Sequence, residues 1–294
     1  MSLGEALTVD GYVIVRAVVP RSLTEAVVAD IEGHLEASLD DLSSLYGHPE
    51  LPPTGFVDDR GTYLPKMFHY PSMWAIRQYP GVHAAFSAIL GTEALWVSTA
   101  NLCVKLPESD DHPEYAGAGF IHWDRMRHSL TDPRASIDNT KNPDSGLFLS
   151  GLVALRDTTE EMGGFQCVPE IYRDLDAWVS RQPDEWDPRN PDLTGYPIRT
   201  VPMKAGDLCI WTSRLPHGNG NNISGAARLA QYVTMAPAPV EFPDYELRRA
   251  RRIAAFRARA PLPAPTSYCS RESGLPPPEL SDLGRRLLGA DHWY

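Results

Sequence analysis

The middle of this chain reads as a series of short strands rather than as an alternation of strands and helices. From Gly91 to Met235, apolar and β-branched residues recur with a period of two between Gly-, Pro- and Asp-rich turns. The runs lie at 95–106, 120–123, 147–155, 165–168, 198–201, 207–212 and 228–235. Helix-like segments gather before and after them, and the chain has no G-x-G-x-x-G fingerprint. These patterns predict a mainly β fold with an antiparallel core and flanking helices.

Segments at both ends of the chain predict the covering helices. A strand is expected at Tyr12–Val19, and Ser22 with Glu25 forms an S-x-x-E pattern that predicts a capping box for the next helix. A basic helix is expected at 244–259, before a proline-rich connector at 261–278. The 27 prolines among 294 residues favour many turns over a helical bundle.

Charge and hydropathy exclude several classes of protein. The 27 Lys and Arg residues against 38 Asp and Glu residues give a net charge of −11, which disfavours binding to nucleic acid or anionic lipid. The longest apolar run, 146–155, is much shorter than the ~20 residues that cross a bilayer. The N-terminus shows no basic segment before an apolar stretch, so the cytoplasm is the expected location. We interpret Cys103, Cys167, Cys209 and Cys269 as buried, reduced thiols, since none forms a CxxC pair.

A His-x-Asp triplet, His122-Trp123-Asp124, stands at the end of an apolar run. In an extended chain, residues i and i+2 point to the same side, so His122 and Asp124 could reach one metal ion. Three other His-x-acid triplets, which begin at His34, His48 and His112, lie in a predicted helix or in polar loops. The strand context therefore makes His122 and Asp124 the candidate ligands.

A second histidine and an arginine flank a turn between two later strands. The strand 207–212 leads to His217, a Gly- and Asn-rich turn follows, and Arg228 begins the next strand. We expect a hairpin that brings His217 and Arg228 near each other. Two imidazoles and one carboxylate on one side of an ion leave open positions, as in the facial triad of non-haem Fe(II) oxygenases. An Arg in the same barrel would hold the far carboxylate of a chelating oxoacid.

The order and spacing of these motifs resemble the phytanoyl-CoA dioxygenase family of Fe(II)/2-oxoglutarate-dependent oxygenases, over about residues 8–236. The matching stretches are Asp10-Gly-Tyr-Val-Ile-Val, His122-Trp-Asp124, GLVALRD at 151–157, GGFQCVP at 163–169, Gly206-Asp207, and His217 followed eleven residues later by Arg228. The resemblance implies a double-stranded β-helix core of the jelly-roll or cupin-like kind. It also implies that a single oxygenase domain fills residues 1–294, with a C-terminal helical and proline-rich cover at 240–294.

The same resemblance implies which residues hold the cofactors. The implied ligands are His122, Asp124 and His217 for Fe(II), and Arg228, Asn219 and Ser150 for 2-oxoglutarate, with O2 as the second co-substrate. Related halogenases replace the metal-binding carboxylate with a small residue. The presence of Asp124 therefore favours hydroxylation over halogenation.

Five further residues are candidate substrate contacts because of where they lie along the sequence. They are Arg125 and Arg127, which follow the triplet, Trp123 and Trp211, which flank the proposed ligands, and Lys105 on the 95–106 strand. The alternative is that the cations lie on solvated segments and that the tryptophans belong to the core. We interpret the arginine-rich run at 248–259 as a solvated helix face that pairs with acidic neighbours.

The sequence therefore predicts a dioxygenase that hydroxylates a small-molecule metabolite, in the tailoring of a natural product. Desaturation, epimerisation or ring formation could start from the same site. A metal- or ligand-binding β-barrel without turnover remains an alternative, as does an iron dioxygenase whose own substrate chelates the metal. The expected partner is a small molecule, with no nucleic acid and no membrane, and the oligomeric state is left open.

Overall fold

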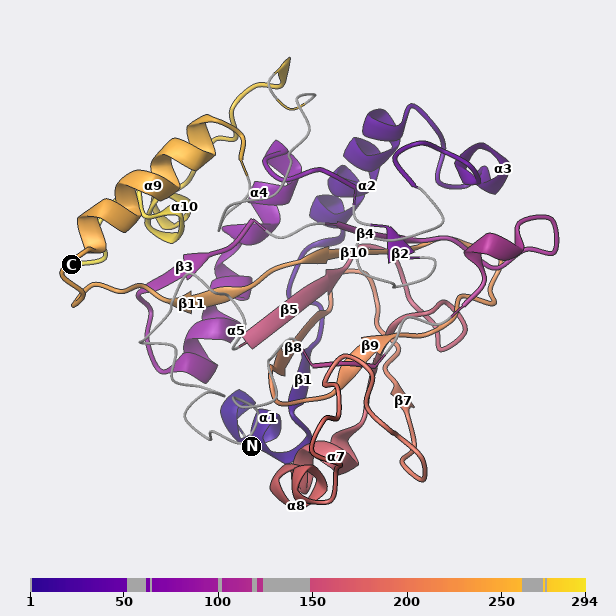
Figure 1. Cartoon of the computed structure of the whole chain (residues 1–294). Helices are drawn as coiled ribbons and strands as arrows, with labels where there is room; N and C mark the ends of the chain where they lie inside the picture. Colours follow the sequence, from indigo (N-terminus) through magenta and orange to yellow (C-terminus); the bar gives the residue numbers. More distant parts are fainter. Residues whose placement is uncertain are drawn as a thin grey trace.

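A computed structural model describes residues 2–51, 62–63, 65–99, 102–117, 121–123, 149–260, 272 and 274–294 of the chain. Figure 1 shows a central sheet with helices on one side and a smaller sheet on the other. Helices lie mainly at the two ends of the sequence, and the strands fill its middle. Within these residues, no helix is long and apolar enough to cross a membrane.

The larger sheet, within the described residues, has six strands in the order β1-β8-β5-β10-β4-β2, and each pairs antiparallel with its neighbours. The strands are β1 (Tyr12–Val15), β2 (Thr62–Tyr63), β4 (Leu102–Lys105), β5 (Leu149–Ala154), β8 (Leu208–Thr212) and β10 (Arg228–Tyr232). Spatial neighbours are distant in sequence, so the sheet joins the start, middle and end of the predicted core.

Two smaller antiparallel sheets complete the described strands. One has the order β7-β6-β9, from β6 (Phe165–Cys167), β7 (Arg199–Thr200) and β9 (His217–Asn219). The other pairs β3 (Leu95–Val97) with β11 (Met235–Pro237). The predicted strand at 95–106 is therefore two strands in different sheets. The predicted mainly β core with antiparallel pairing is confirmed.

The two faces of the larger sheet pack against different partners. Because side chains alternate along a strand, Val13, Ile210 and Leu229 lie on the face that joins the main hydrophobic cluster with the helices. The opposite face, here called the inner face, carries Cys209 and Ala230 and packs against strand β6 of the three-stranded sheet. The inner face therefore lies between two sheets, as the interior of a β-sandwich does.

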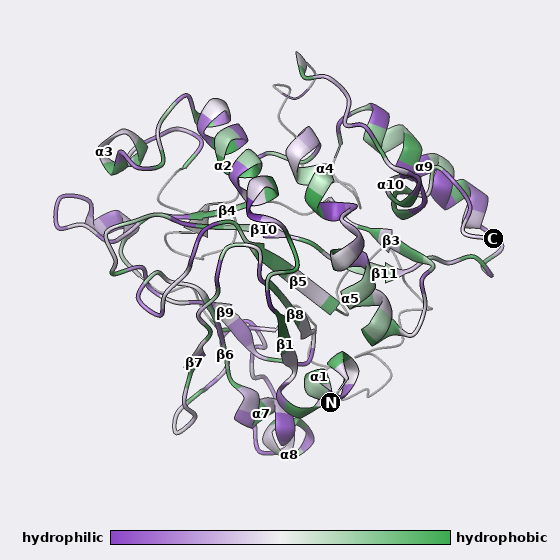
Figure 2. Cartoon of the chain, turned by 180° about the vertical axis from the view of Figure 1, so that it is seen from behind, coloured by the Kyte–Doolittle hydropathy of each residue, from purple (hydrophilic) through white to green (hydrophobic). Residues whose placement is uncertain are grey.

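The described helices cover the outer face and the two ends of the core. They are α1 (Leu3–Asp10), α2 (Arg21–Leu35), α3 (Leu42–Leu45), α4 (Pro71–Arg77), α5 (Pro80–Leu90), a 3₁₀ turn at Pro113–Tyr115, α7 (Pro169–Arg173), α8 (Leu175–Ser180), α9 (Tyr245–Arg257) and α10 (Asp282–Leu288). In Figure 2 the ribbon of α5 is mostly hydrophobic, whereas α9 alternates between hydrophobic and strongly hydrophilic residues.

The predicted capping box is wrong for α2. This helix begins at Arg21 with Pro20 at its N-cap, and no side chain caps it. Ser22 therefore lies inside the first turn, where its hydroxyl is past the N-cap position. A capping box is instead present on α1, where Ser2 and Glu5 bond each other's backbone N–H groups.

The Gly-Asp motif before β8 fixes a tight contact with the chain after β1. Gly206 has a φ of +87° and accepts a hydrogen bond from Val19 N at 3.0 Å. A Cβ at this position would lie 2.1 Å from Val19 O. A glycine is therefore required here both by the left-handed backbone and by the lack of space.

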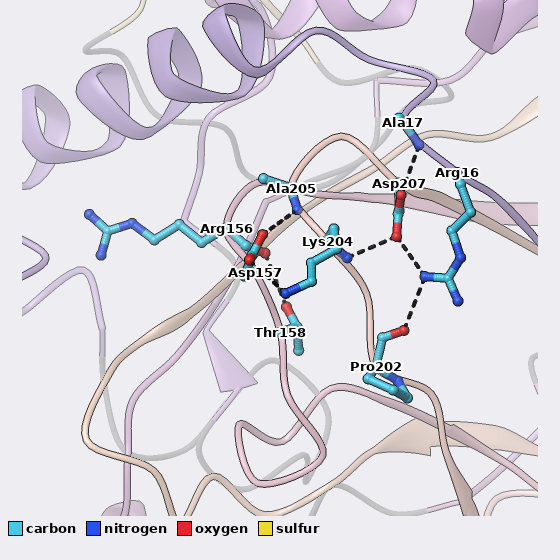
Figure 3. Close-up of polar contacts among 9 residues, drawn as sticks. All are labelled: Arg16, Ala17, Arg156, Asp157, Thr158, Pro202, Lys204, Ala205 and Asp207. Atoms are coloured by element: carbon cyan, nitrogen blue, oxygen red, sulfur yellow. Dashed lines mark hydrogen bonds and ion pairs between the residues drawn. The ribbon is translucent and has the colours of Figure 1, made fainter.

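Two aspartates of the matched motifs hold the same turn (Figure 3). Asp207, which is buried, accepts hydrogen bonds from the backbone N–H groups of Ala17 and Lys204 and from the guanidinium of Arg16, at 2.7–2.8 Å. Asp157 accepts from the Lys204 ammonium at 3.0 Å. The oxygens of Asp207 join the chain after β1 to the turn before β8, and those of Asp157 join the chain after β5 to the same turn. Both carboxylates therefore have a structural role.

The arginine-rich helix α9 packs on the end of α10 rather than facing solvent throughout. Arg249 and Arg252 are buried and donate to carbonyl oxygens at the C-terminal end of α10, including those of Leu288 and Gly289, at 2.8 Å. These carbonyls have no partner within their own helix, and cations are favourable near them. The predicted solvated face is therefore wrong for these two arginines, although Arg248 does pair with an acidic neighbour, Asp244.

Candidate functional site

The two predicted imidazole ligands lie side by side at strand β9, the edge of the three-stranded sheet. His122 and His217 form an antiparallel bridge, with N···O distances of 2.9 and 3.0 Å between their backbones. Their ring centroids are 5.0 Å apart. Directly paired residues share a face of a sheet. The chain therefore presents both imidazoles on one side, although they are 95 positions apart in sequence.

The environment of His217 selects one ring nitrogen for binding. Its side chain is 6% exposed, and Nδ1 lies 2.9 Å from the carbonyl oxygen of Leu215. Because a carbonyl only accepts, Nδ1 carries the proton, and Nε2 is the nitrogen with the lone pair. A backbone carbonyl that orients the distal nitrogen is usual for a metal-binding histidine. The arrangement of this residue fits a metal ligand.

The third predicted ligand, Asp124, lies outside the described residues, as do Arg125 and Arg127. Among the residues that the structure does describe, no group of three or more His, Cys, Asp and Glu side chains could hold a metal ion. The described site therefore contains the two imidazoles of the predicted triad, and the role of Asp124 stays a prediction.

Arg228 lies at the start of β10 on the inner face and is 2% exposed. Its Nη1 donates to Cys103 Sγ at 2.9 Å and to Asn219 Oδ1 at 3.1 Å, and its Nε finds no acceptor in the described part of the chain. Burial acts to lower the pKa of Arg228, but contacts with Cys103 and Tyr232 outweigh it and hold the pKa above its ordinary value. A charged guanidinium is thus held in the interior by neutral side chains, with one donor to spare.

The predicted hairpin between His217 and Arg228 is not formed, because β9 pairs with β6 and β10 pairs with β4 and β5. The two residues lie in different sheets that face each other. The hydrogen bond from Arg228 to Asn219 crosses from one sheet to the other and brings the predicted 2-oxoglutarate residues together.

Three further predicted site residues lie on the same inner face, as the strand register shows. Ser150 is the direct partner of Trp211, and Lys105 is the direct partner of Arg228. Lys105 is buried, and its Nζ donates to Gly117 O at 3.2 Å. The Trp211 ring centroid lies 5.2 Å from that of His217, and the buried indole Nε1 has no hydrogen-bond acceptor among the described residues.

Gly163 makes room for the Lys105 stem. This residue has a φ of +68°, and a Cβ there would lie 2.8 Å from Lys105 Cδ and Cε. The Gly-Gly motif thus lets the turn before β6 approach the inner face closely.

Trp123 lies away from the paired imidazoles. Because side chains alternate along an extended segment, its ring points to the opposite side from His122, into a cluster with Trp178 and Trp186. This position favours the alternative that Trp123 belongs to the core rather than to a pocket wall.

The sequence reasoning did not single out Cys103 as a partner of Arg228. The residue is two positions before Lys105 in an apolar strand, so the period of two could have placed it on the inner face. Cys103, Cys167 and Cys209 are buried free thiols, as predicted, and Cys269 lies outside the described residues. Burial raises the pKa of Cys167 to about 12, so this thiol, the direct partner of His217, stays protonated at neutral pH.

Known proteins share both the sequence pattern and the fold. The model of the phytanoyl-CoA dioxygenase (PhyH) family matches residues 7–230. A Dictyostelium discoideum protein named for phytanoyl-CoA dioxygenase is 23% identical over 184 residues, which is 55% of this chain and 52% of that protein. The chain spans little more than half the length of the curated relatives it matches.

Two solved structures from nogalamycin biosynthesis have a similar fold. The epimerase SnoN, determined with Fe3+, α-ketoglutarate and nogalamycin RO, has a TM-score of 0.54 at 20% identity, covering 80% of this chain and 82% of that one. The α-ketoglutarate-dependent carbocyclase SnoK has a TM-score of 0.54 at 21% identity, covering 84% and 89%. At such identities the likeness establishes the fold.

These findings define the fold: a double-stranded β-helix with an antiparallel core. Because the family model spans residues 7–230, the chain belongs to the phytanoyl-CoA dioxygenase family. The cofactors of this family are Fe(II) and 2-oxoglutarate, which agrees with the cofactors that the sequence predicted.

Proposed function

We propose that this protein is an Fe(II)- and 2-oxoglutarate-dependent dioxygenase that hydroxylates a small-molecule metabolite. The metal ligands of the proposal are His122, Asp124 and His217. The observation that carries it is the buried guanidinium of Arg228, which faces neutral acceptors and keeps an unsatisfied donor on the face that looks toward the histidine pair. A buried cation of this kind is suited to a carboxylate ligand, because the bidentate pair offsets the cost of burial.

The protein's part in the reaction is to place and orient the reactants. Arg228 would hold the far carboxylate of 2-oxoglutarate, Asn219 orients the guanidinium from the opposite sheet, and Ser150 adds a hydroxyl on the same face. When bound, Fe(II) with 2-oxoglutarate and O2 supplies the oxidation, and the co-substrate leaves as succinate and CO2. The apolar wall of Trp211 and Phe165, with ring centroids 4.8 Å apart, excludes water from the side of His217.

The substrate part of the proposal rests on fewer contacts. Lys105 and Trp211 are placed to meet it, since both lie on the inner face, and Arg125 and Arg127 remain candidates from sequence. The nogalamycin enzymes SnoN and SnoK are an epimerase and a carbocyclase. Their fold supports a natural-product substrate here, and makes epimerisation or ring formation the alternative outcomes to hydroxylation.

Succinate formation tests the proposed activity. The purified chain with Fe(II), 2-oxoglutarate and O2 should consume O2 and release succinate slowly without a substrate, and His217→Ala should abolish both. Matched consumption of 2-oxoglutarate and O2 supports the proposal. Absence of any binding of Fe(II) or 2-oxoglutarate in calorimetry would overturn it.

A β-barrel that binds a metal without turnover is the second candidate. It needs the metal ligands, among them the paired imidazoles, and no residue that binds 2-oxoglutarate. It predicts metal binding with no 2-oxoglutarate-dependent O2 uptake, so an oxygen electrode separates the two. The buried Arg228 favours the enzyme, because metal binding alone does not require that residue.

A further inference from the structure

Hydrogen bonds and buried packing hold the segment that carries His122 to the rest of the protein. Within the described residues, two backbone hydrogen bonds join His122 to His217, and Trp123 donates two more hydrogen bonds. The backbone N–H of Trp123 donates to Pro188 O at 2.9 Å, and its indole Nε1 donates to Arg214 O at 2.7 Å.

The indole bond joins the two segments that supply the imidazoles. Arg214 lies three residues before His217, and Trp123 directly follows His122. The Nε1–H···O bond therefore spans from one ligand segment to the other, on the side away from the imidazole rings. The bond is short, and the donor side chain is buried, since Trp123 is 1% exposed.

The ring itself is fixed by two other tryptophans. The centroid of Trp123 lies 5.2 Å from that of Trp178 on α8 and 5.5 Å from that of Trp186, and the latter two are 5.0 Å apart. Tilted and edge-on contacts at these distances are favourable and restrict ring rotation. The donor is thus aimed at Arg214 O by packing.

We propose that Trp123 is a positioning residue for the histidine pair, and that its indole N–H sets the spacing between His122 and His217 and thereby strengthens metal binding. This inference rests on the proposed function, because it takes the two histidines as Fe(II) ligands. A preorganised pair binds more tightly, since the metal does not have to supply the free energy that orders its ligands.

The same cluster offers a matched control. The Nε1 of Trp186 is buried and has no hydrogen-bond partner among the described residues. Trp186→Phe therefore removes the same part of a ring from the same cluster without removing a hydrogen bond, whereas Trp123→Phe removes the bond to Arg214 as well.

Anaerobic calorimetric titration of Fe(II) into the full-length chain tests the inference. Trp123→Phe should weaken Fe(II) binding about tenfold or more, as loss of an orienting contact commonly does, and Trp186→Phe should leave it within about twofold. Chemical unfolding of the metal-free proteins should show destabilisation in both variants, greater in Trp123→Phe because it also loses a hydrogen bond. A loss of Fe(II) affinity that is confined to Trp123→Phe would not arise from packing alone.

Replacing Trp123 with its benzothiophene analogue provides a second variant, which keeps the ring shape and lacks the N–H. It should weaken Fe(II) binding as Trp123→Phe does, even if the phenylalanine variant folds poorly. Equal Fe(II) affinity in the analogue and the wild type would overturn the positioning role. Absence of Fe(II) binding by the wild type would instead overturn the proposed function.

Discussion

Replacing Arg228 with methionine separates stability from co-substrate binding. In the protein without 2-oxoglutarate, the guanidinium donates to Cys103 and Asn219, both neutral. Hydrogen bonds from a charged donor contribute about 1.5–3 kcal/mol each. Burying the ion costs several kcal/mol, so the two effects nearly cancel. We expect Arg228→Met to change the free energy of unfolding of the metal-free protein by less than about 2 kcal/mol.

The effect on 2-oxoglutarate binding should be much larger. Truncating one partner of a buried charge pair costs about 2–5 kcal/mol, which corresponds to a Kd raised about 30-fold to about 5000-fold. Arg228→Lys keeps the charge but loses the planar fork, so its loss should be smaller than that of Arg228→Met.

Two measurements on the same samples check this reasoning. Anaerobic calorimetry with the Fe(II)-loaded protein gives the 2-oxoglutarate affinity, and urea unfolding of the metal-free protein gives stability. A Kd for 2-oxoglutarate in Arg228→Met within about threefold of the wild-type value, which is a difference of about 0.7 kcal/mol, would show that Arg228 is not the carboxylate anchor. If the variant loses much of its free energy of unfolding while its 2-oxoglutarate affinity is unchanged, the arginine has a structural role instead.

Three further predictions concern stability. Gly206→Ala should destabilise the protein by more than about 2 kcal/mol in urea unfolding, whereas Gly225→Ala, which has open space, should change little. Burial lowers the pKa of His69 to about 3, so below pH 6.5 the unfolded chain binds a proton that the folded chain does not. The free energy of unfolding should therefore fall by about 2 kcal/mol from pH 7 to pH 5, and His69→Gln should reduce this pH dependence. Arg252→Met should speed hydrogen exchange in α10, and the exposed Arg251→Met should not.

The period of two in the sequence was enough to predict most of the larger sheet. The apolar runs at 147–155, 207–212 and 228–235 contain β5, β8 and β10. The same pattern could not show that the run at 95–106 divides between two sheets, because both parts are equally buried. Burial on both faces removes the alternation that would mark a strand's orientation.

The site was predicted in part because its residues follow motifs, and in part missed because its contacts are long-range. His122 and His217 were placed together, and the structure pairs them. The expected hairpin was wrong, since β9 and β10 face each other across two sheets. Nothing local in the sequence could show that Trp123 bonds to Arg214, because that contact depends on the bridge between two distant segments.

Anaerobic titration of 2-oxoglutarate into the protein with and without Fe(II) tests whether the metal and the co-substrate share one site. We expect one equivalent of Fe(II) per chain, 2-oxoglutarate binding that tightens when the metal is present, and loss of that tightening in His217→Ala. Binding of 2-oxoglutarate with the same affinity in the presence and absence of Fe(II), or in His217→Ala, would contradict it.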